Sequence, residues 1–288
     1  MTEVDKNPSP TVSFKTLGCR LNQAETAVIK RYFIDAGYRL VPFGDPCDIC
    51  FVHSCTVTAN AERKSLQYCR SAMRRDDTGT VILAGCAVEA AGHNAFADDT
   101  ADIFFDQHEK FILPGIVSRR SCSEAENVCI PVFSKTRALL RIQTGCDFNC
   151  AYCIVPRARG NPISRNTPEI IEEAERLVGE GYREIVVTGA NIGLYADGKR
   201  NLVDVLQGLE NIPGLQRIRL SSIEPTTVEN MVIDYMKSSE KLCRYLHIPL
   251  QSGDDTILSR MGRKYTCSQY SKILERAQST LPLCGLGW

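Results

Sequence analysis

Three cysteines stand close together near the middle of the chain, at Cys146, Cys150 and Cys153. A loop with the spacing C-x3-C-x2-C can place three thiolates on three irons of one four-iron cubane, which leaves the fourth iron open to bind a small chelating molecule. The alternatives are a zinc site or a chance grouping, but zinc prefers paired C-x2-C knuckles and a fourth ligand. The spacing therefore favours an iron–sulfur cluster with one iron available for chemistry.

A second group of cysteines is spread over the first third of the chain, at Cys19, Cys55 and Cys86. Each follows a short apolar run that is typical of a buried strand. The carboxyl ends of neighbouring parallel strands meet at one edge of a sheet, about 4.8 Å apart, so three ends span about 10 Å. Cys19 and Cys86, like Cys146, follow a glycine, which permits a tight turn beside a bulky group. Three ordinary buried cysteines are the alternative, and the periodicity alone does not decide between the two.

The elements that must position the spread cysteines alternate between apolar runs and amphipathic stretches. The pattern predicts strands over 12–17, 49–53, 81–84 and 103–105 and helices over 22–36, 60–75 and 108–117. This alternation is typical of an α/β domain with a parallel sheet, of the flavodoxin or Rossmann type. We expect this domain to cover residues 1–122 and a polar linker to follow over 123–136.

A second alternation fills residues 137–288. Strands are predicted over 139–143, 184–188, 217–221 and 245–250, and a fifth begins at 285–288. A helix is predicted over 167–180, with Thr167 as its N-cap and Pro168 at its first position. Four βα units in this length predict an incomplete (β/α) barrel. The loop of Cys146 follows the first of these strands, on the face that carries the chemistry in such barrels.

Composition limits the classes of protein that the chain can belong to. With 43% hydrophobic and 24% charged residues over 288 positions, it is a globular chain. Lys and Arg together number 34, as do Asp and Glu, so no overall field attracts nucleic acid or anionic lipid. No run approaches the ~18 apolar residues of a membrane span, and the first residues do not resemble a secretory signal. We expect a cytoplasmic protein with no membrane partner, in which fourteen cysteines favour metal or redox chemistry.

The run 145–154, Gly-Cys-Asp-Phe-Asn-Cys-Ala-Tyr-Cys-Ile, resembles the cluster loop of the radical S-adenosylmethionine (SAM) superfamily. Seven further runs extend the resemblance to the methylthiotransferase family: 16–22, 55–58, 84–87, 156–160, 188–193, 221–225 and 247–253. The resemblance implies two [4Fe-4S] clusters. The catalytic cluster would be held by Cys146, Cys150 and Cys153, and an auxiliary cluster by the metal ligands Cys19, Cys55 and Cys86.

The same resemblance implies where SAM would bind. Its candidate contacts are Tyr152 in the cluster loop and four residues at strand ends, namely Gly189, Asn191, Glu224 and Gln251. Two of these positions have plainer interpretations. The turn that contains Gly189 is also consistent with an ordinary strand-to-helix loop, and Glu224 precedes a proline, as a helix-start carboxylate does. His53 and His247 lie on or beside apolar strands, and we interpret them as core histidines rather than ligands.

In the family, the substrates are an adenosine beside the tRNA anticodon or an aspartate of a small-subunit ribosomal protein. The sequence motifs of this chain are most similar to those of the branch that acts on N6-threonylcarbamoyladenosine at tRNA position 37. One SAM would methylate a sulfur at the auxiliary cluster, and a second would yield the 5′-deoxyadenosyl radical that activates C2 of the adenine. The expected partners are tRNA and an electron donor of the flavodoxin or ferredoxin type. A basic stretch around the cluster loop could contact phosphates, though surface arginines are common: it comprises Lys135, Arg137, Arg141, Arg157, Arg159 and Arg165.

The other cysteines have weaker patterns. Cys47 and Cys50 have redox-like spacing, but they lie at a strand start, so we predict a packing role, and a rival cluster with Cys55 would require an extended strand to fold back. The remaining six are interpreted as core or surface thiols: Cys69, Cys122, Cys129, Cys243, Cys267 and Cys284.

The chain departs from the family pattern at three places. His53-Ser54 replaces the usual Asn-Thr, and Arg157 replaces a common aromatic residue. The chain also ends at Trp288, before the remaining barrel strands and the C-terminal RNA-binding β-barrel domain of the family. This predicts a truncated or frameshifted product with an open barrel edge, weak tRNA affinity and doubtful activity. The alternatives are a cluster-binding remnant without catalysis, and a zinc or thiol-redox protein.

Overall fold

The computed structural model describes residues 9–92, 95–111, 136–228, 230–282 and 284–287. The chain forms two compact units, residues 1–132 and 133–288. The predicted linker 123–136 lies outside the described residues except for its last residue. The helix predicted over 108–117 is described only at its start, where residues Glu109–Phe111 form a single 3-10 turn, η2.

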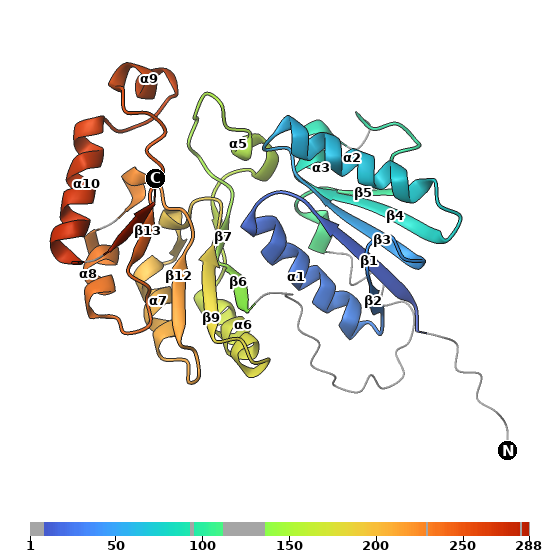
Figure 1. The fold of residues 1–288 in the computed structure, drawn as a ribbon, viewed down its shortest axis with the longest axis horizontal. Helices are drawn as coiled ribbons and strands as arrows, with labels where there is room; N and C mark the ends of the chain where they lie inside the picture. The colour runs from blue at the N-terminus through green and yellow to red at the C-terminus, as the bar shows by residue number, and fades with distance from the viewer. Residues whose placement is uncertain (1–8, 93–94, 112–135, 229, 283, 288) are drawn as a thin grey trace. The chain divides into compact units, whose positions relative to one another are not determined.

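The first unit is built on one parallel sheet of five strands (Figure 1). Its strands are β1 (Thr11–Thr16), β2 (Arg39–Val41), β3 (Cys47–Ser54), β4 (Thr78–Gly85) and β5 (Ile103–Phe105). The spatial order is β2-β1-β3-β4-β5 and every pairing is parallel. This is the flavodoxin-like order, so the predicted fold class of the first domain is confirmed.

Helices cover both faces of this sheet. Helix α1 (Arg20–Asp35) packs Ile29 and Phe33 on one face, against the β3 residue Phe51. Helices α2 (Ala59–Met73) and α3 (Cys86–Ala91) cover the other face, as Figure 1 shows. Since both faces are covered, the central residues of β3 and β4 are apolar and buried, as in buried parallel strands. Helix α2 begins at an N-cap whose hydroxyl, on Thr58, accepts a hydrogen bond from the Ala61 N–H at 3.1 Å.

The second unit carries parallel strands β6 (Arg137–Arg141), β9 (Glu184–Thr188) and β12 (Arg217–Leu220). Strands β13 (Tyr245–His247) and β14 (Gly285–Gly287) form a parallel pair beside them, and a bridge between Ile218 and Leu242 joins the two groups. Short strands β7 (Gln143–Thr144) and β8 (Ile163–Ser164) pair antiparallel, as do β10 (Ala196–Asp197) and β11 (Arg200–Asn201). The parallel strands confirm the predicted partial (β/α) barrel.

Helices follow the strands of the second unit in sequence. They are α5 (Val155–Arg159), α6 (Thr167–Gly179), α7 (Leu202–Glu210), α8 (Asn230–Ser238), α9 (Asp255–Arg260) and α10 (Cys267–Thr280), with 3-10 turns η3 (Ile192–Leu194) and η4 (Pro225–Thr227). Capping boxes start α7 at Asn201 and α10 at Thr266. Among the described residues, no helix combines the length and apolar character that crossing a bilayer requires.

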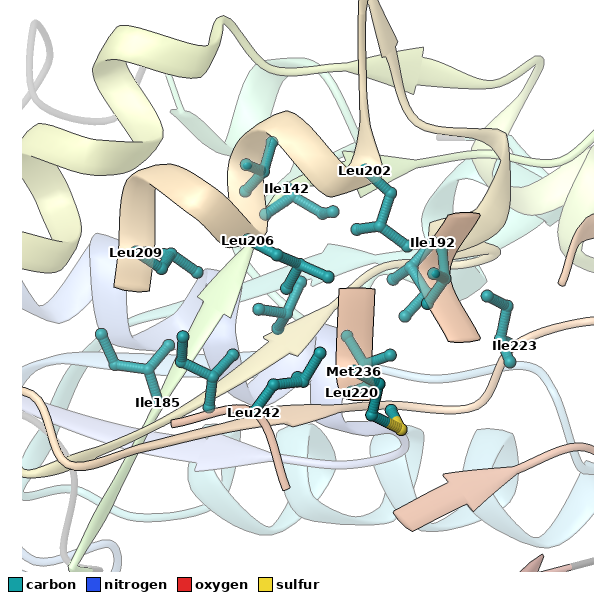
Figure 2. Packing of buried hydrophobic residues seen from close by; sticks show 14 of the residues in the cluster. Ile142, Ile185, Ile192, Leu202, Leu206, Leu209, Leu220, Ile223, Met236 and Leu242 are labelled. Carbon is teal, nitrogen blue, oxygen red and sulfur yellow. The ribbon is translucent and has the colours of Figure 1, made fainter. Parts of the chain in front are cut away.

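The core of the second unit lies between these helices and the strands. Figure 2 shows Leu206 and Leu209 of α7 beside Ile185 of β9 and Leu220 of β12. Leu206, Leu209 and Ile185 have no exposed surface, and burial of one such side chain contributes roughly 1.5–3 kcal/mol. This packing holds the strand ends in place beneath the loops that carry the candidate site.

Strand β2 was not predicted from the sequence, and two further details also differ from the sequence predictions. The N-cap of α6 is Asn166 rather than Thr167, because the Thr167 hydroxyl donates instead to Asp197 Oδ2, at 2.7 Å. Strand β13 ends at His247 and does not reach residue 250. Pro249 has no N–H to donate to the ladder, so the strand stops before it.

Candidate functional site

The three spread cysteines of the first unit follow neighbouring strands. Cys19 comes after β1 and is the N-cap of α1, Cys55 directly follows β3, and Cys86 directly follows β4 and begins α3. Because β1, β3 and β4 are adjacent and parallel, all three cysteines lie at one edge of the sheet. The first two flank the position where the strand order reverses, which is where this fold class binds ligands. Cys55 and Cys86 are buried and Cys19 is exposed.

Two polar side chains tie the three strand ends together. Asn22 has no exposed surface, and its Nδ2 donates to the carbonyl oxygens of Leu17, at 2.9 Å, and Ser54, at 2.8 Å. The Ser54 hydroxyl donates to the Ala84 carbonyl at 2.8 Å and accepts from the Ala87 N–H at 3.1 Å. These bonds fix the spacing of the turns that present the thiols. Sequence reasoning did not single out Asn22, although it stands three residues after Cys19.

A glycine precedes each of Cys19, Cys86 and Cys146, and all three glycines have positive φ. At Gly18, φ is +93° and an added Cβ would lie 2.6 Å from both Cβ and Sγ of Cys55. No Cβ can stand that close to another side chain, so the backbone at Gly18 needs glycine for space as well as for conformation.

Replacement of Gly18 by alanine is therefore expected to displace the Cys55 thiol and, if the three cysteines of the first unit hold a cluster as the resemblance implies, to prevent that cluster from binding. Iron per chain after anaerobic reconstitution should fall from about eight to about four. The matched control is Gly44→Ala, since Gly44 has a similar φ of +104° but an added Cβ there meets only Arg75 Nη1, at 3.7 Å. Equal iron in the two variants would show that the space beside Cys55 does not matter.

One cysteine sulfur in each unit accepts a hydrogen bond from a side chain. Gln107 Nε2 donates to Cys86 Sγ at 3.0 Å, and Arg263 Nη1 donates to Cys150 Sγ at 3.1 Å. Arginine can only donate, so Cys150 must accept, as a metal-bound thiolate would. Among the described residues, no three His, Cys, Asp or Glu side chains converge as they would around a single metal ion. A cubane binds each thiolate on a different iron, so its ligands need no such convergence.

A cavity of about 220 Å³ lies at the carboxyl ends of the second unit's strands. Its lining consists of the cluster loop and the turns that follow the neighbouring strands. The residues are Cys146, Phe148, Cys150, Tyr152, Cys153, Val155, Ala190, Asn191, Ser222, Ile223, Glu224, Pro249, Gln251 and Arg263. The structure therefore brings the three closely spaced cysteines and four of the five predicted SAM contacts to one cavity. Gly189 does not line it, because its backbone packs against Gln143.

Arg263 connects three parts of this cavity. Its guanidinium forms a partly buried ion pair with Glu224 and contacts Tyr152 Oη at 3.4 Å in addition to Cys150 Sγ. Burial lowers the pKa of Arg263, but the charge and hydrogen bond of Glu224, together with Tyr265, raise that pKa by more, so Arg263 is a cation. Sequence reasoning did not single out Arg263, because it lies outside any cysteine motif and no strand precedes it directly.

The segment that carries Arg263 packs on the cluster loop. The Ala151 N–H donates to the Met261 carbonyl at 3.0 Å, and Lys264 Nζ lies 5.1 Å from the centre of the Phe148 ring. Gln143, also buried, holds the loop from the other side: its Nε2 donates to the Gly145 carbonyl at 2.7 Å, and its Oε1 accepts from the Asn191 N–H at 3.0 Å. The cluster loop is thus clamped between two elements of its own unit.

Burial raises the pKa of the Cys146 thiol, and the Phe148 N–H partly opposes that rise. Burial also raises the pKa of Tyr152, partly opposed by the positive charge of Arg263. A thiol with a raised pKa is protonated at neutral pH, and only a thiolate binds iron, so cluster binding here would release protons.

The other predicted residues take structural positions. His53 has no exposed surface, and its Nδ1 lies 2.8 Å from Thr26 Oγ1; His247 Nδ1 lies 2.6 Å from Ser222 Oγ. In the basic stretch, Arg159 donates to Thr144 Oγ1 at 3.1 Å and Arg165 pairs with Glu173 at 2.6 Å. These two arginines are therefore used within the fold, and Lys135 lies outside the described residues.

The cysteines outside the two triads differ in burial. Cys47, Cys50 and Cys69 pack in the apolar cluster between the sheet and α2. Burial raises the pKa of Cys50 to about 11, which makes this thiol inert at neutral pH. Cys122 and Cys129 lie outside the described residues, and Cys243, Cys267 and Cys284 are half-buried.

Two family profiles match the chain. That of the Radical SAM superfamily matches residues 140–286, and that of Uncharacterized protein family UPF0004 matches residues 11–106. Two solved structures resemble the fold at 12–13% sequence identity. The radical SAM methyltransferase TsrM from Kitasatospora setae has a TM-score of 0.67 over 94% of this chain and 68% of that one, and the cobalamin-dependent radical enzyme OxsB has 0.65 over 97% and 49%. The class of the protein is thus radical SAM.

Relatives narrow this class. The threonylcarbamoyladenosine tRNA methylthiotransferase MtaB of Bacillus subtilis is 36% identical over 94% of this chain and 64% of its own length. MtaB of Aquifex aeolicus is 31% identical over 96% and 71%. A tRNA-2-methylthio-N(6)-dimethylallyladenosine synthase of Dehalococcoides mccartyi is 34% identical over 93% and 64%. The chain belongs to the methylthiotransferase family of the radical SAM superfamily, and it spans about 64% of the length of the Bacillus subtilis relative.

Proposed function

We propose that the protein is a radical SAM methylthiotransferase that adds a methylthio group to C2 of N6-threonylcarbamoyladenosine at position 37 of tRNA. The observation that carries the proposal is the placement of Cys19, Cys55 and Cys86 at three adjacent strand ends, in a chain that also has the C-x3-C-x2-C loop. A single cluster loop would support radical chemistry in general, whereas two cysteine triads support sulfur insertion. The substrate is supported by the relatives named MtaB, at 31–36% identity.

Cys146, Cys150 and Cys153 would hold one [4Fe-4S] cluster, which with SAM supplies a radical able to activate an unreactive C–H bond. A radical is required because the aromatic C–H at C2 has no acidic proton for a base to remove. The cavity lies beside these thiols, and its polar side chains Asn191, Glu224 and Gln251 have the groups needed to bind the ribose and the amino acid part of SAM. Tyr152 offers an aromatic face for the adenine, and Gly189 would act through the turn that carries Asn191.

Cys19, Cys55 and Cys86 would hold the auxiliary [4Fe-4S] cluster. The three thiols are suited to an iron–sulfur cluster, because the Gln107 side chain presents an N–H to the sulfur of Cys86. In addition, Cys19 is exposed while Cys55 and Cys86 are buried. Because Cys19 is exposed, these three residues would leave the bound group accessible from the side of Cys19. The partners that belong to this proposal are tRNA and an electron donor of the flavodoxin or ferredoxin type, in the cytoplasm.

The test is nucleoside analysis. Full chain, reconstituted with iron and sulfide without oxygen, is incubated with SAM, reductant and tRNA that carries N6-threonylcarbamoyladenosine. The digested tRNA should contain the 2-methylthio nucleoside by mass spectrometry, and the chain should bind about eight irons. Bound zinc in place of iron would contradict the proposal, and the Cys146→Ala variant is the control without SAM cleavage.

A different adenosine is the second candidate, favoured by the dimethylallyladenosine-directed relatives at 34–35% identity. The same assay with tRNA that carries N6-dimethylallyladenosine separates the two, because each product has its own mass. The aspartate of a ribosomal protein is tested with that protein in place of tRNA. Bound iron with neither 5′-deoxyadenosine release nor a modified product from any of these would support the cluster-binding remnant.

A further inference from the structure

The row of strand ends that carries the three cysteines has a fourth member. After β5, the turn at Asp106 is held by its own carboxylate, whose Oδ1 accepts from the N–H groups of His108, at 2.7 Å, and Glu109, at 2.8 Å. This turn places Gln107 beside α3, where its N–H donates to Glu89 Oε2 at 3.3 Å. Since β5 is the neighbour of β4, Gln107 stands next to Cys86, and it is buried.

The amide nitrogen and the amide oxygen of Gln107 each have one hydrogen-bond partner. Nε2 is 3.0 Å from Cys86 Sγ, and Oε1 accepts a hydrogen bond from Lys110 Nζ. A lysine ammonium donates only, so it must face the amide oxygen, and the NH₂ group must therefore face the sulfur. A thiol can donate or accept, but toward Gln107 the sulfur of Cys86 can only accept. The arrangement suits a Cys86 that is a thiolate.

Lys110 is itself fixed by a buried carboxylate. Lys110 has no exposed surface and Glu25 has 1%, and their Nζ and Oε2 atoms are 2.8 Å apart. His53 Nε2 lies 3.3 Å from the same Nζ. Lysine and glutamate are almost never fully buried unless paired, and burial of such a pair costs desolvation energy. The ion pair is connected to Cys86 by hydrogen bonds through the side-chain amide of Gln107. The ion pair has no role in the function proposed above.

We infer that Gln107 is a positioning residue for the auxiliary cluster, donating an N–H hydrogen bond to the Cys86 thiolate while Lys110 and Glu25 hold its amide in the donor orientation. The inference rests on the proposed function. A donor to a cluster thiolate withdraws negative charge, and this stabilises the reduced cluster more than the oxidised one because the reduced cluster carries one more electron. Gln107 therefore raises the reduction potential of the cluster in the first unit.

The experiment measures that potential directly. In the full chain with Cys146, Cys150 and Cys153 replaced by alanine, only the first unit's cluster remains, and its midpoint potential is followed by absorption and electron paramagnetic resonance in an anaerobic redox titration. Gln107→Met removes the donor, and Gln107→Glu removes it while keeping an oxygen for Lys110, so the second variant retains the buried contact. The matched control is Gln67→Met, at an exposed position of α2.

Both Gln107 variants are expected to shift the midpoint potential to more negative values than Gln67→Met. Loss of iron from both folded Gln107 variants, with Gln67→Met retaining it, also supports the inference, because the donor would then be needed to hold the thiolate. An unchanged potential in both variants overturns the inference and leaves the proposed function standing. Failure of the background chain itself to bind iron overturns the inference and the proposed function together.

Discussion

Replacement of Lys110 by methionine is expected to lower the free energy of unfolding by about 3–5 kcal/mol, the cost of breaking a buried ion pair by removing one partner. The change removes the cation that lies 2.8 Å from the Glu25 carboxylate, a group with 1% exposed surface, and leaves His53 Nε2 at 3.7 Å from the same oxygen. It also removes the donor that fixes Gln107. The measurement is urea unfolding of the full chain, with hydrogen exchange of the β3 and β4 amides to assign the loss to the first unit.

Two variants serve as references for Lys110. Lys64→Met changes an exposed lysine of α2 and should leave the unfolding free energy nearly unchanged. The double variant Lys110→Met/Glu25→Leu should recover much of the loss, because two apolar side chains replace the pair without leaving a buried charge. If Lys110→Met is as stable as Lys64→Met, the ammonium group is not buried in solution.

The parts of the fold that could be predicted from sequence are those with a strong local period. The apolar runs that end at Leu17, His53 and Ala84 predicted three parallel strands, and their cysteines lie at one sheet edge because parallel strands put their carboxyl ends together. The glycines before Cys19, Cys86 and Cys146 predicted tight turns, and the structure gives all three a positive φ. Such features depend on a few neighbouring residues and can therefore be predicted from a single sequence.

The residues that contact the cysteines could not be predicted from the local sequence. Gln107 and Lys110 are 21 and 57 residues from Cys86 and His53, their respective partners, and glutamine and lysine carry no spacing signal. His53 illustrates the same limit: it departs from the usual asparagine of the family, yet its ring takes part in the buried network with Lys110 and Thr26. Buried polar networks are assembled by the tertiary fold, so the local pattern predicts that a histidine is internal but not what it bonds.

In the second unit, replacement of Arg263 by methionine is expected to slow cleavage of SAM roughly 10–100-fold, the usual effect of removing a side chain that supports a metal ligand. Arg263 contacts Cys150 Sγ at 3.1 Å and Tyr152 Oη at 3.4 Å, and it pairs with Glu224. Without it, the cluster loop and the cavity wall lose their shared cation. The measurement is 5′-deoxyadenosine release from reconstituted full chain, per cluster counted by iron analysis.

Two causes of the slower SAM cleavage in Arg263→Met can be distinguished. If the unpaired Glu224 carboxylate is responsible, the second change Glu224→Gln should restore cleavage in the Arg263→Met chain. If the contact with Cys150 and Tyr152 is responsible, as the geometry indicates, the double variant should remain slow. Arg263→Lys should also remain slow, because an ammonium cannot reproduce the planar fork that reaches these partners at once. Arg260→Met, at an exposed position of α9 three residues earlier, is the control, and a rate for Arg263→Met that equals it would contradict the role of Arg263 in the cavity.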